Sequence, residues 1–241
     1  VRSRGLGDVY KRQILQDSNG KIWVFFLSYD RIDAGHYHVF YVTSTNGGNT
    51  WTEPALFLPA YVLGISVMAG AATFRDSTGK LWVAWQDEGQ VGLWFTTSVD
   101  GINWADAKLL CTPGDDKIGS FIETRGKIWF FLSSSHTGWM QISYETTVDG
   151  GNSWSDLTMI TDSGNFYPHA IVLSNGTILV AYQHYPYTMQ YCTSSDGGST
   201  WSEATFDNPE SDRDPYCIEY GEKIYVFFNR LYDDPFSHPH T

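Results

Sequence analysis

The 241-residue sequence predicts an all-β protein made of repeated four-stranded units, and three observations carry this prediction. A short turn segment that ends in Trp occurs four times. Its tryptophans, Trp51, Trp104, Trp154 and Trp201, lie 53, 50 and 47 positions apart. Strongly apolar segments recur with the same period, and no segment shows a helical pattern. Repeats of about 40–50 residues with four strands each are typical of a β-propeller with antiparallel blades.

The second strand of each repeat has the clearest pattern. Five segments are apolar at nearly every position: Lys21–Leu27, Lys80–Trp85, Lys127–Leu132, Thr177–Tyr182 and Lys223–Phe228. We expect these strands to be buried on both faces, because the second strand of a blade lies between neighbouring blades. Hairpin-turn residues precede each segment, for example Asp17-Ser18-Asn19-Gly20.

The remaining strands follow from their position around the turn segments. Third strands are predicted at Val39–Thr43, Leu93–Thr97, Ile142–Thr146 and Met189–Thr193, and fourth strands at Glu53–Leu58, Ala105–Leu110, Ser155–Thr161 and Glu203–Phe206. The sequence therefore predicts four complete blades and the first two strands of a fifth. The parent protein is expected to have five or six blades.

Each residue type in the turn segment has a structural reason. The Asp or Asn side chain accepts hydrogen bonds from nearby backbone N–H groups, and Gly supplies a positive φ. Trp places a large apolar side chain under the turn. We expect the four tryptophans to be largely buried there. The residues expected to organise the four turns are Asn46 with Trp51, Asp100 with Trp104, Asp149 with Trp154, and Asp196 with Trp201.

The pattern S-x-D-x-G-x-[ST]-W in these turns resembles the Asp box, or BNR repeat, of the sialidase superfamily. The resemblance covers the chain from about Ile14 to Phe228. It implies a propeller whose Asp boxes are structural turns remote from the active site. Asp boxes also occur in propellers that are not sialidases, so the resemblance is more specific for fold than for activity.

The two ends of the sequence differ from the repeats. Residues 1–13, VRSRGLGDVYKRQ, resemble a translated sequencing adapter of the kind found in metagenomic gene predictions, and we interpret them as a non-native leader. Residues 14–241 are expected to form one propeller domain that is incomplete at its C-terminus. With the native N-terminus missing, a signal peptide could not be observed, and we expect the parent protein to be secreted or located at the cell surface.

Composition limits the partners. The net charge of −12 argues against nucleic acid and anionic membranes as partners. The chain lacks the apolar run of about 20 residues that a transmembrane helix needs. Its three widely spaced cysteines, Cys111, Cys192 and Cys217, suggest buried free thiols and not a zinc site. We expect no metal and no cofactor.

The predicted topology separates two faces. The Asp boxes join third and fourth strands, so they share a face with the turns between first and second strands. The loops between second and third strands, and the links between blades, lie on the opposite face, which we call the variable face. Varied loops on a repetitive scaffold are where binding sites usually lie.

The sialidase resemblance implies three arginines that hold a substrate carboxylate, a Tyr nucleophile activated by a Glu, and an Asp as acid and base. A planar guanidinium pairs with a carboxylate through two hydrogen bonds. Arg31, Arg213 and Arg230 are expected on the variable face, whereas Arg75 and Arg125 are expected on the Asp-box face. The Arg-Ile-Pro motif of the family is absent from this sequence.

The densest polar cluster on the variable face opens the last inner strand, at Arg213, Asp214 and Tyr216. Strand alternation would place Asp214 and Tyr216 on the same side, where a Tyr and a carboxylate can act as nucleophile and base. Asp115 and Asp116 are expected to approach from across the channel. The segment Arg213-Asp214-Pro215 also resembles the Asp-Pro strand openings of five-bladed arabinanase-type glycosidases.

Further candidates lie on the same face. Tyr167 and His169 are expected from the adjacent blade, and Trp139 on a loop could stack on a sugar ring. The others are the carboxylates Asp87 and Glu88, the loop aromatics Tyr185 and Tyr187, and the histidines His36, His38, His136 and His184. The sequence thus favours an exo-acting glycoside hydrolase. The alternative is a non-catalytic propeller that binds glycans or proteins.

Overall fold

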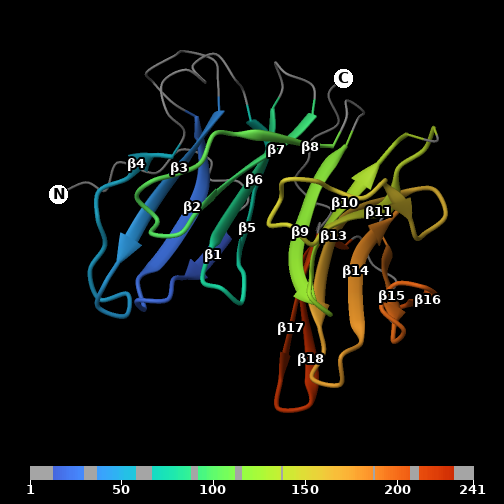
Figure 1. The fold of residues 1–241 in the computed structure, drawn as a ribbon. Coiled ribbons are helices and arrows are strands. Elements are labelled where there is room, and N and C mark those ends of the chain that lie inside the picture. Colours follow the sequence, from blue (N-terminus) through green and yellow to red (C-terminus); the bar gives the residue numbers. More distant parts are fainter. Residues whose placement is uncertain are drawn as a thin grey trace, which may run out of the picture.

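The computed structural model describes residues 13–29, 37–57, 67–87, 92–111, 116–136, 138–186, 188–206 and 212–230. These residues form eighteen β-strands and no helix, which confirms the all-β prediction (Figure 1). The first strand begins at Gln13, and residues 1–12 of the expected leader lie outside the described part of the chain.

Four sheets have four antiparallel strands each, in chain order, and a fifth has two. The first sheet holds β1 (Gln13–Gln16), β2 (Ile22–Tyr29), β3 (Tyr37–Ser44) and β4 (Ala55–Leu56). The second holds β5 (Val67–Arg75), β6 (Leu81–Asp87), β7 (Gly92–Ser98) and β8 (Lys108–Cys111). The third holds β9 (Lys117–Thr124), β10 (Lys127–Ser134), β11 (Gln141–Thr147) and β12 (Thr158–Met159). The fourth holds β13 (Asn165–Val172), β14 (Ile178–His184), β15 (Thr188–Ser194) and β16 (Ser202–Thr205), and the fifth is the hairpin of β17 (Asp212–Tyr220) and β18 (Lys223–Arg230).

The sheets are the blades of a β-propeller, with the first strand of each blade nearest the common axis (Figure 1). Successive inner strands contact one another, from β1 to β5, β9, β13 and β17. The five sheets do not close into a ring within the described residues.

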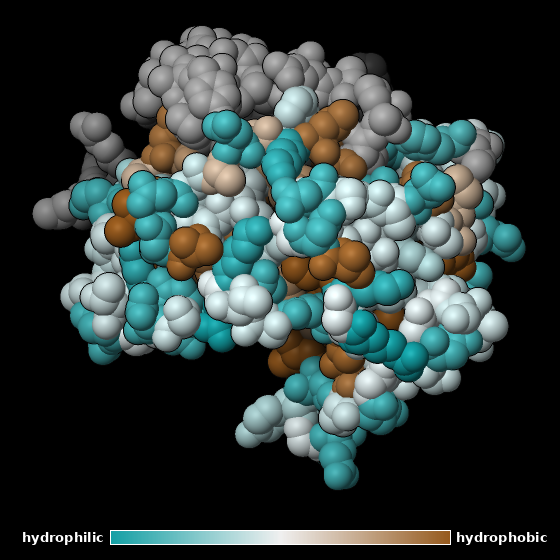
Figure 2. Space-filling model, viewed as in Figure 1, coloured by the Kyte–Doolittle hydropathy of each residue, from teal (hydrophilic) through white to brown (hydrophobic). Residues whose placement is uncertain are grey.

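Hydrophobic cores fill the space between neighbouring blades. On β10, Phe130 belongs to the core shared with the second sheet, and the next residue, Phe131, belongs to the core shared with the fourth. Both side chains are fully buried. This confirms burial on both faces for β10, which lies between two blades and is apolar without alternation. The same expectation is wrong for β18, where Ile224 is 43% exposed and Phe227 is 55% exposed, because no described strand packs outside the β17–β18 hairpin, which projects from the body of the molecule (Figure 2).

The Asp boxes form the expected turns. In the last box, Asp196 Oδ1 accepts hydrogen bonds from the N–H groups of Ser199 and Thr200, both at 3.0 Å, and Oδ2 accepts from Thr200 Oγ1 at 2.6 Å. The Thr200 hydroxyl is the main reason that the pKa of Asp196 lies well below its usual range. In the first box, Asn46 Oδ1 accepts a hydrogen bond from the N–H of Thr50 at 3.0 Å, whereas Asn46 Nδ2 donates one to Thr50 Oγ1 at 2.8 Å.

The box tryptophans pack against the preceding blade. The rings of Trp104 and Phe57 have centroids 4.7 Å apart, those of Trp154 and Phe95 5.6 Å apart, and those of Trp201 and Phe131 6.1 Å apart. The expectation of burial is wrong for Trp51, which is 43% exposed. No described sheet precedes the first blade, so nothing in the described structure covers this indole.

Three of the fourth strands are shorter than predicted: β4 and β12 have two residues each and β8 has four, whereas β16 has the predicted four. After the box Trp, the chain first meets the third strand at an isolated hydrogen bond, such as the one from Ser155 N to Thr146 O at 2.8 Å. Regular pairing resumes only at β12, where Tyr144 is paired with Thr158.

Candidate functional site

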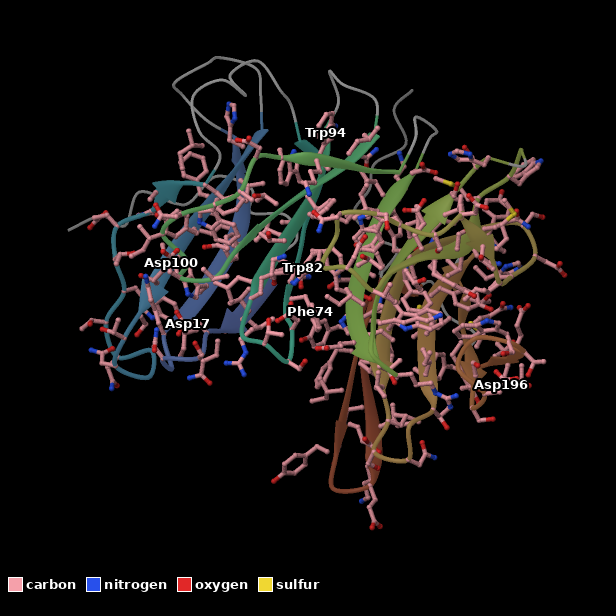
Figure 3. All side chains as sticks on the ribbon, in the orientation of Figure 1. Asp17, Phe74, Trp82, Trp94, Asp100 and Asp196 are labelled. Atoms are coloured by element: carbon pink, nitrogen blue, oxygen red, sulfur yellow. The ribbon has the colours of Figure 1, made fainter. Side chains whose placement is uncertain are left out.

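The inner strands of all five blades line an axial cavity of about 530 Å³. Its polar lining residues are Gln13, Thr73, Ser120, Glu123, His169, Tyr216 and Glu219. Apolar residues line the rest, including Phe74, which stacks on Phe121 with ring centroids 6.2 Å apart. Figure 3 shows Phe74 and Trp82 on the side of the second sheet that faces the third.

His169 and Tyr216, from adjacent inner strands, meet at the variable-face end of this cavity. Their ring centroids are 4.3 Å apart with the planes tilted by 44°. His169 Nδ1 accepts a hydrogen bond from the N–H of Cys217 at 3.1 Å. Burial lowers the pKa of His169 to about 4. The ring is therefore neutral at pH 7 and carries its proton on Nε2, as a hydrogen-bond donor.

Bulges shape the inner strands just above this pair. The register of β17 shifts between Arg213 and Tyr216, and that of β13 shifts between Phe166 and His169. At each bulge a residue with positive φ precedes a proline: Asp214 (φ 51°) and Tyr167 (φ 54°). Such bulges re-aim side chains and occur often beside active sites.

The bulge in β17 changes the expected relation between Asp214 and Tyr216. From Arg213 to Tyr216 the chain advances three residues, whereas the paired residues on β18 advance only two, so side chains of β17 do not alternate regularly between the two faces across the bulge. Tyr216 lines the axial cavity and is 41% exposed, whereas Asp214 is not among the lining residues. Asp214 Oδ2 instead accepts a hydrogen bond from Asn229 Nδ2 at 3.5 Å.

Asp116 lies apart from the cavity. It is 1% exposed, and its Oδ2 is 3.5 Å from Nε2 of His136 on the same blade. Near it the structure reveals a buried carboxyl that sequence reasoning missed. Glu145 on β11 has its pKa raised to about 8, chiefly by burial and further by Asp116 and Asp156. Asp115 lies outside the described residues.

The structure describes only part of the expected arginine set. Arg213 and Arg230 lie at the variable-face ends of β17 and β18, one register step apart, and their side chains lie outside the described atoms. Arg31 lies outside the described residues. Arg125 is on the Asp-box face as predicted, because its Nη2 donates to the carbonyl oxygen of Ser195 at 2.8 Å.

Two exposed aromatics lie on adjoining loops of the variable face. Trp139 is 72% exposed and Tyr185 is 65% exposed. Gly164 connects their loops, since its N–H donates to Met140 O at 2.7 Å and its carbonyl accepts from Tyr185 N at 2.8 Å. Tyr187 and Glu88 lie outside the described residues.

Glu123 and Glu219, at the Asp-box end of the cavity, were not predicted as site residues. Glu123 accepts hydrogen bonds from Ser77 N at 2.6 Å and Ser77 Oγ at 2.7 Å. Glu219 holds Ser174 in the same way. In both pairs, Ser77 with Glu123 and Ser174 with Glu219, a turn Ser is followed about one repeat later by an inner-strand Glu. This recurring spacing is the sequence signal that could have indicated the hydrogen bonds between blades.

Other expectations concern thiols, metals and membranes. Cys192 and Cys217 are buried free thiols, as predicted, and the side chain of Cys111 lies outside the described atoms. Among the described residues, no group of three or more His, Cys, Asp or Glu is placed to hold a metal ion. The described chain also contains no helix long and apolar enough to cross a membrane.

Comparisons with known proteins place this architecture among propellers. No protein-family model matches the sequence, and no curated protein matches it. The Penicillium chrysogenum α-L-arabinanase, solved with arabinobiose, superposes with a TM-score of 0.72 at 16% identity, over 91% of this chain and 74% of the arabinanase.

Two sialidases have similar scores. The Trypanosoma rangeli sialidase, solved with sialic acid, has a TM-score of 0.68 at 13% identity, and a Hadza microbial sialidase has 0.66 at 18% identity. These matches cover 93% and 81% of this chain. The chain spans only 44% and 46% of the two sialidases, respectively. At these identities the likeness establishes the propeller fold.

Proposed function

We propose that this chain is part of a carbohydrate-active propeller, and that its activity is exo-acting glycoside hydrolysis of the sialidase-like kind. The observation that carries the proposal is the contact between Tyr216 and His169 at the variable-face end of the axial cavity, directly after the bulge at Asp214. The fold supports it, since the solved structures described above are propellers whose names are those of glycoside hydrolases.

The proposed reaction uses Tyr216 as the nucleophile. Its Oη attacks the anomeric carbon while Asp214 accepts the phenolic proton, directly or through one water, and the bond to the leaving oxygen breaks. The leaving oxygen takes a proton from Asp115, since the neighbouring Asp116 is buried apart from the cavity. Water then attacks the anomeric carbon and gives a proton to the Asp115 carboxylate, while the glycosyl–tyrosine bond breaks and Asp214 returns the phenolic proton to Tyr216. His169 Nε2–H is a donor for a substrate oxygen.

Substrate binding is proposed for the arginines and the neighbouring polar residues. Arg31, Arg213 and Arg230 would hold an anionic group of the sugar, since guanidinium and carboxylate match in geometry. Tyr167 and Trp139 would border the sugar at the rim. A secreted or cell-surface location would give the protein access to glycoconjugates.

The alternative is a propeller that binds glycans without catalysis. One observation favours it: Trp139 and Tyr185 are strongly exposed on loops that Gly164 ties together. Exposed aromatic pairs of this kind suit stacking on sugar rings.

A panel of fluorogenic exo-glycosides, sialosides included, tests the proposal with Asp214→Asn and Tyr216→Phe. The matched control is Tyr220→Phe, which removes a hydroxyl from the same strand at an exposed position on the Asp-box side. We expect the first two variants to lose at least about 100-fold in kcat/KM, and the control to keep its activity. Losses of less than about threefold, or ~0.7 kcal/mol of transition-state stabilisation, would refute the site.

A protein that hydrolyses no glycoside in the panel calls for a second measurement. Retention on a glycan array, abolished by Trp139→Ala and unaffected by Tyr216→Phe, would support the binding propeller in place of the enzyme.

A further inference from the structure

The bulge in β13 belongs to the fourth blade, but side chains of the third blade hold it. The two strands that supply them, β9 and β10, lie beside β13 (Figure 1). We propose that Ser133 on β10 is a positioning residue of the candidate site, which keeps Tyr167 in the bulged conformation at the variable-face end of the inner strand. The effect of Ser133 on activity rests on the proposed function, whereas its effect on the bulge does not.

The conformation of Tyr167 needs support from outside its own strand. Tyr167 has a φ of 54°, in the left-handed region that residues other than glycine seldom adopt. Pro168 follows it, and the residue before a proline is normally restricted to extended conformations with negative φ. Regular pairing of β13 with β14 also stops at Phe166 and resumes at His169. Neither the local sequence nor the sheet therefore favours this conformation, and other contacts must stabilise it.

Ser133 supplies the hydrogen-bond acceptor that the sheet does not provide. Its Oγ accepts a hydrogen bond from the N–H of Tyr167 at 2.9 Å, across the boundary between the third and fourth blades. Ser133 is fully buried, so water has little access to this N–H as a substitute acceptor. A buried N–H group without an acceptor destabilises the folded state by more than one hydrogen bond contributes. Without the hydroxyl, Tyr167 should therefore leave the bulged conformation.

Gly119 on β9 shapes the space beside the bulge. A Cβ atom on Gly119 would be 2.7 Å from Cγ of Pro168 and 2.9 Å from its carbonyl oxygen. Gly119 is itself the extra residue of a bulge, because the pairing of β9 with β10 passes directly from Ile118 to Ser120. The glycine thus allows the two bulges to pack directly on each other, which limits where Pro168 can lie.

Ser120 holds the residues that follow the bulge. Its Oγ accepts a hydrogen bond from the N–H of Ala170 at 2.8 Å. Ala170 is also fixed by the core between the third and fourth blades, where it is buried. His169 directly precedes Ala170 and is therefore anchored independently of Ser133. Loss of the Ser133 hydroxyl should displace Tyr167 and leave His169 in place.

Hydrogen exchange of a single amide tests whether Ser133 holds the bulge. The dipeptide Phe-Tyr occurs twice in the sequence, ending at Tyr41 and at Tyr167. Labelling Phe carbonyls with carbon-13 and Tyr amides with nitrogen-15 therefore selects these two amides by NMR. Ser133→Ala should speed exchange of the Tyr167 amide at least about tenfold. Tyr41 lies in the regular pairing of β3 with β2, so its exchange should stay the same and serves as the internal reference.

Ser143→Ala is the matched control for Ser133→Ala. Ser143 is also fully buried, on the neighbouring strand β11, and its hydroxyl has no hydrogen-bond partner within the described part of the chain. It faces the second blade, because its cross-strand partner Leu132 belongs to the core shared with that blade. The control therefore removes a buried serine hydroxyl without touching the bulge, and exchange of the Tyr167 amide should not change.

A double-mutant cycle tests whether Ser133 affects substrate binding through Tyr167. On the fluorogenic glycoside that the chain hydrolyses fastest, Ser133→Ala should raise KM at least about fivefold and leave kcat within about twofold, because His169 stays in place. In a Tyr167→Ala background, the same substitution should change KM by less than about twofold. Ser143→Ala should leave both constants unchanged. A general loss of stability would not depend on Tyr167 in this way.

Three results would overturn the proposal. The Tyr167 amide could exchange equally in Ser133→Ala and in the unmodified chain, which would mean that another acceptor replaces the hydroxyl. Exchange could quicken at Tyr167 and Tyr41 alike, as a general loss of stability would predict. The rise in KM could be the same with and without the Tyr167 side chain. A chain that hydrolyses no glycoside would refute the proposed function, while exchange of the Tyr167 amide would still decide whether Ser133 holds the bulge.

Discussion

Gly198 lies directly against the indole of Trp129, so that a Cβ atom on Gly198 would be 2.6 Å from Cη2 of the ring. Gly198 belongs to the Asp box of the fourth blade, and Trp129 to the second strand of the third. Gly48 holds the same place in the first box, and its φ of 89° matches the 87° of Gly198. It meets only its own Trp51, at 3.6 Å. Gly198, the second glycine of its box, is therefore needed for the close contact between blades as well as for the turn.

This pair of glycines gives a matched comparison. Gly198→Ala and Gly48→Ala carry the same backbone cost of a positive φ, because the two torsions are nearly equal. Only Gly198→Ala forces a methyl group into an indole, so it should lower the free energy of unfolding by a further ~1–3 kcal/mol. Urea unfolding of both variants measures the difference. Equal losses would show that the approach to Trp129 is not what requires glycine.

The box tryptophans should also differ in how much each one contributes to the free energy of unfolding. Trp201→Ala opens a cavity in the core that holds Phe131 and Tyr144 and should cost ~3–5 kcal/mol. Trp51→Ala removes a half-exposed side chain and should cost less than about 1 kcal/mol. Thermal unfolding of the two variants at the same protein concentration measures the difference. A Trp51→Ala loss as large as that of Trp201→Ala would mean that Trp51 is covered within the chain.

Glu145 should make the protein less stable as the pH rises. Its folded pKa of about 8 exceeds the usual value of 4.5, so the native state holds a proton that the unfolded state has released between these values. Stability from this group is complete below about pH 4.5 and is lost as pH rises through 8. Glu145→Gln should remove a pH-dependent loss on the order of 2–4 kcal/mol between pH 5 and pH 9. Unfolding curves with parallel pH dependence in the variant and the unmodified chain would contradict this.

His169 should make the protein less stable as the pH falls. Its pKa falls from 6.5 to about 4 on folding, so the unfolded state takes up a proton that the native state excludes. Stability from this group is complete above about pH 6.5 and is lost as pH falls through 4. His169→Asn keeps an oxygen acceptor for the N–H of Cys217 and should flatten the profile between pH 6.5 and pH 4. Chemical denaturation across this range, with His184→Asn as the control, measures the change.

The sequence was sufficient to predict the repeats, because the apolar second strands and the Asp boxes are determined by residues close together in the chain. It could not show which neighbour each box tryptophan packs on, and therefore did not predict that Trp51 would be exposed. The bulges at Asp214 and Tyr167 were missed because alternation assumes a regular strand, and a one-residue register shift leaves no signal besides the following proline. Glu145 was missed because Ile142 and Tyr144 suggest one buried face of β11, whereas the structure buries both.

The packing of each box tryptophan on the preceding blade gives the molecule an order of assembly. During synthesis the chain emerges from its N-terminus, and domains begin to fold as they leave the ribosome. The first blade cannot complete its core until Trp104 has been made, and the third must wait for Trp201. Each nascent blade is thus expected to remain open until the Asp box of its successor arrives, so folding should trail translation by about one repeat.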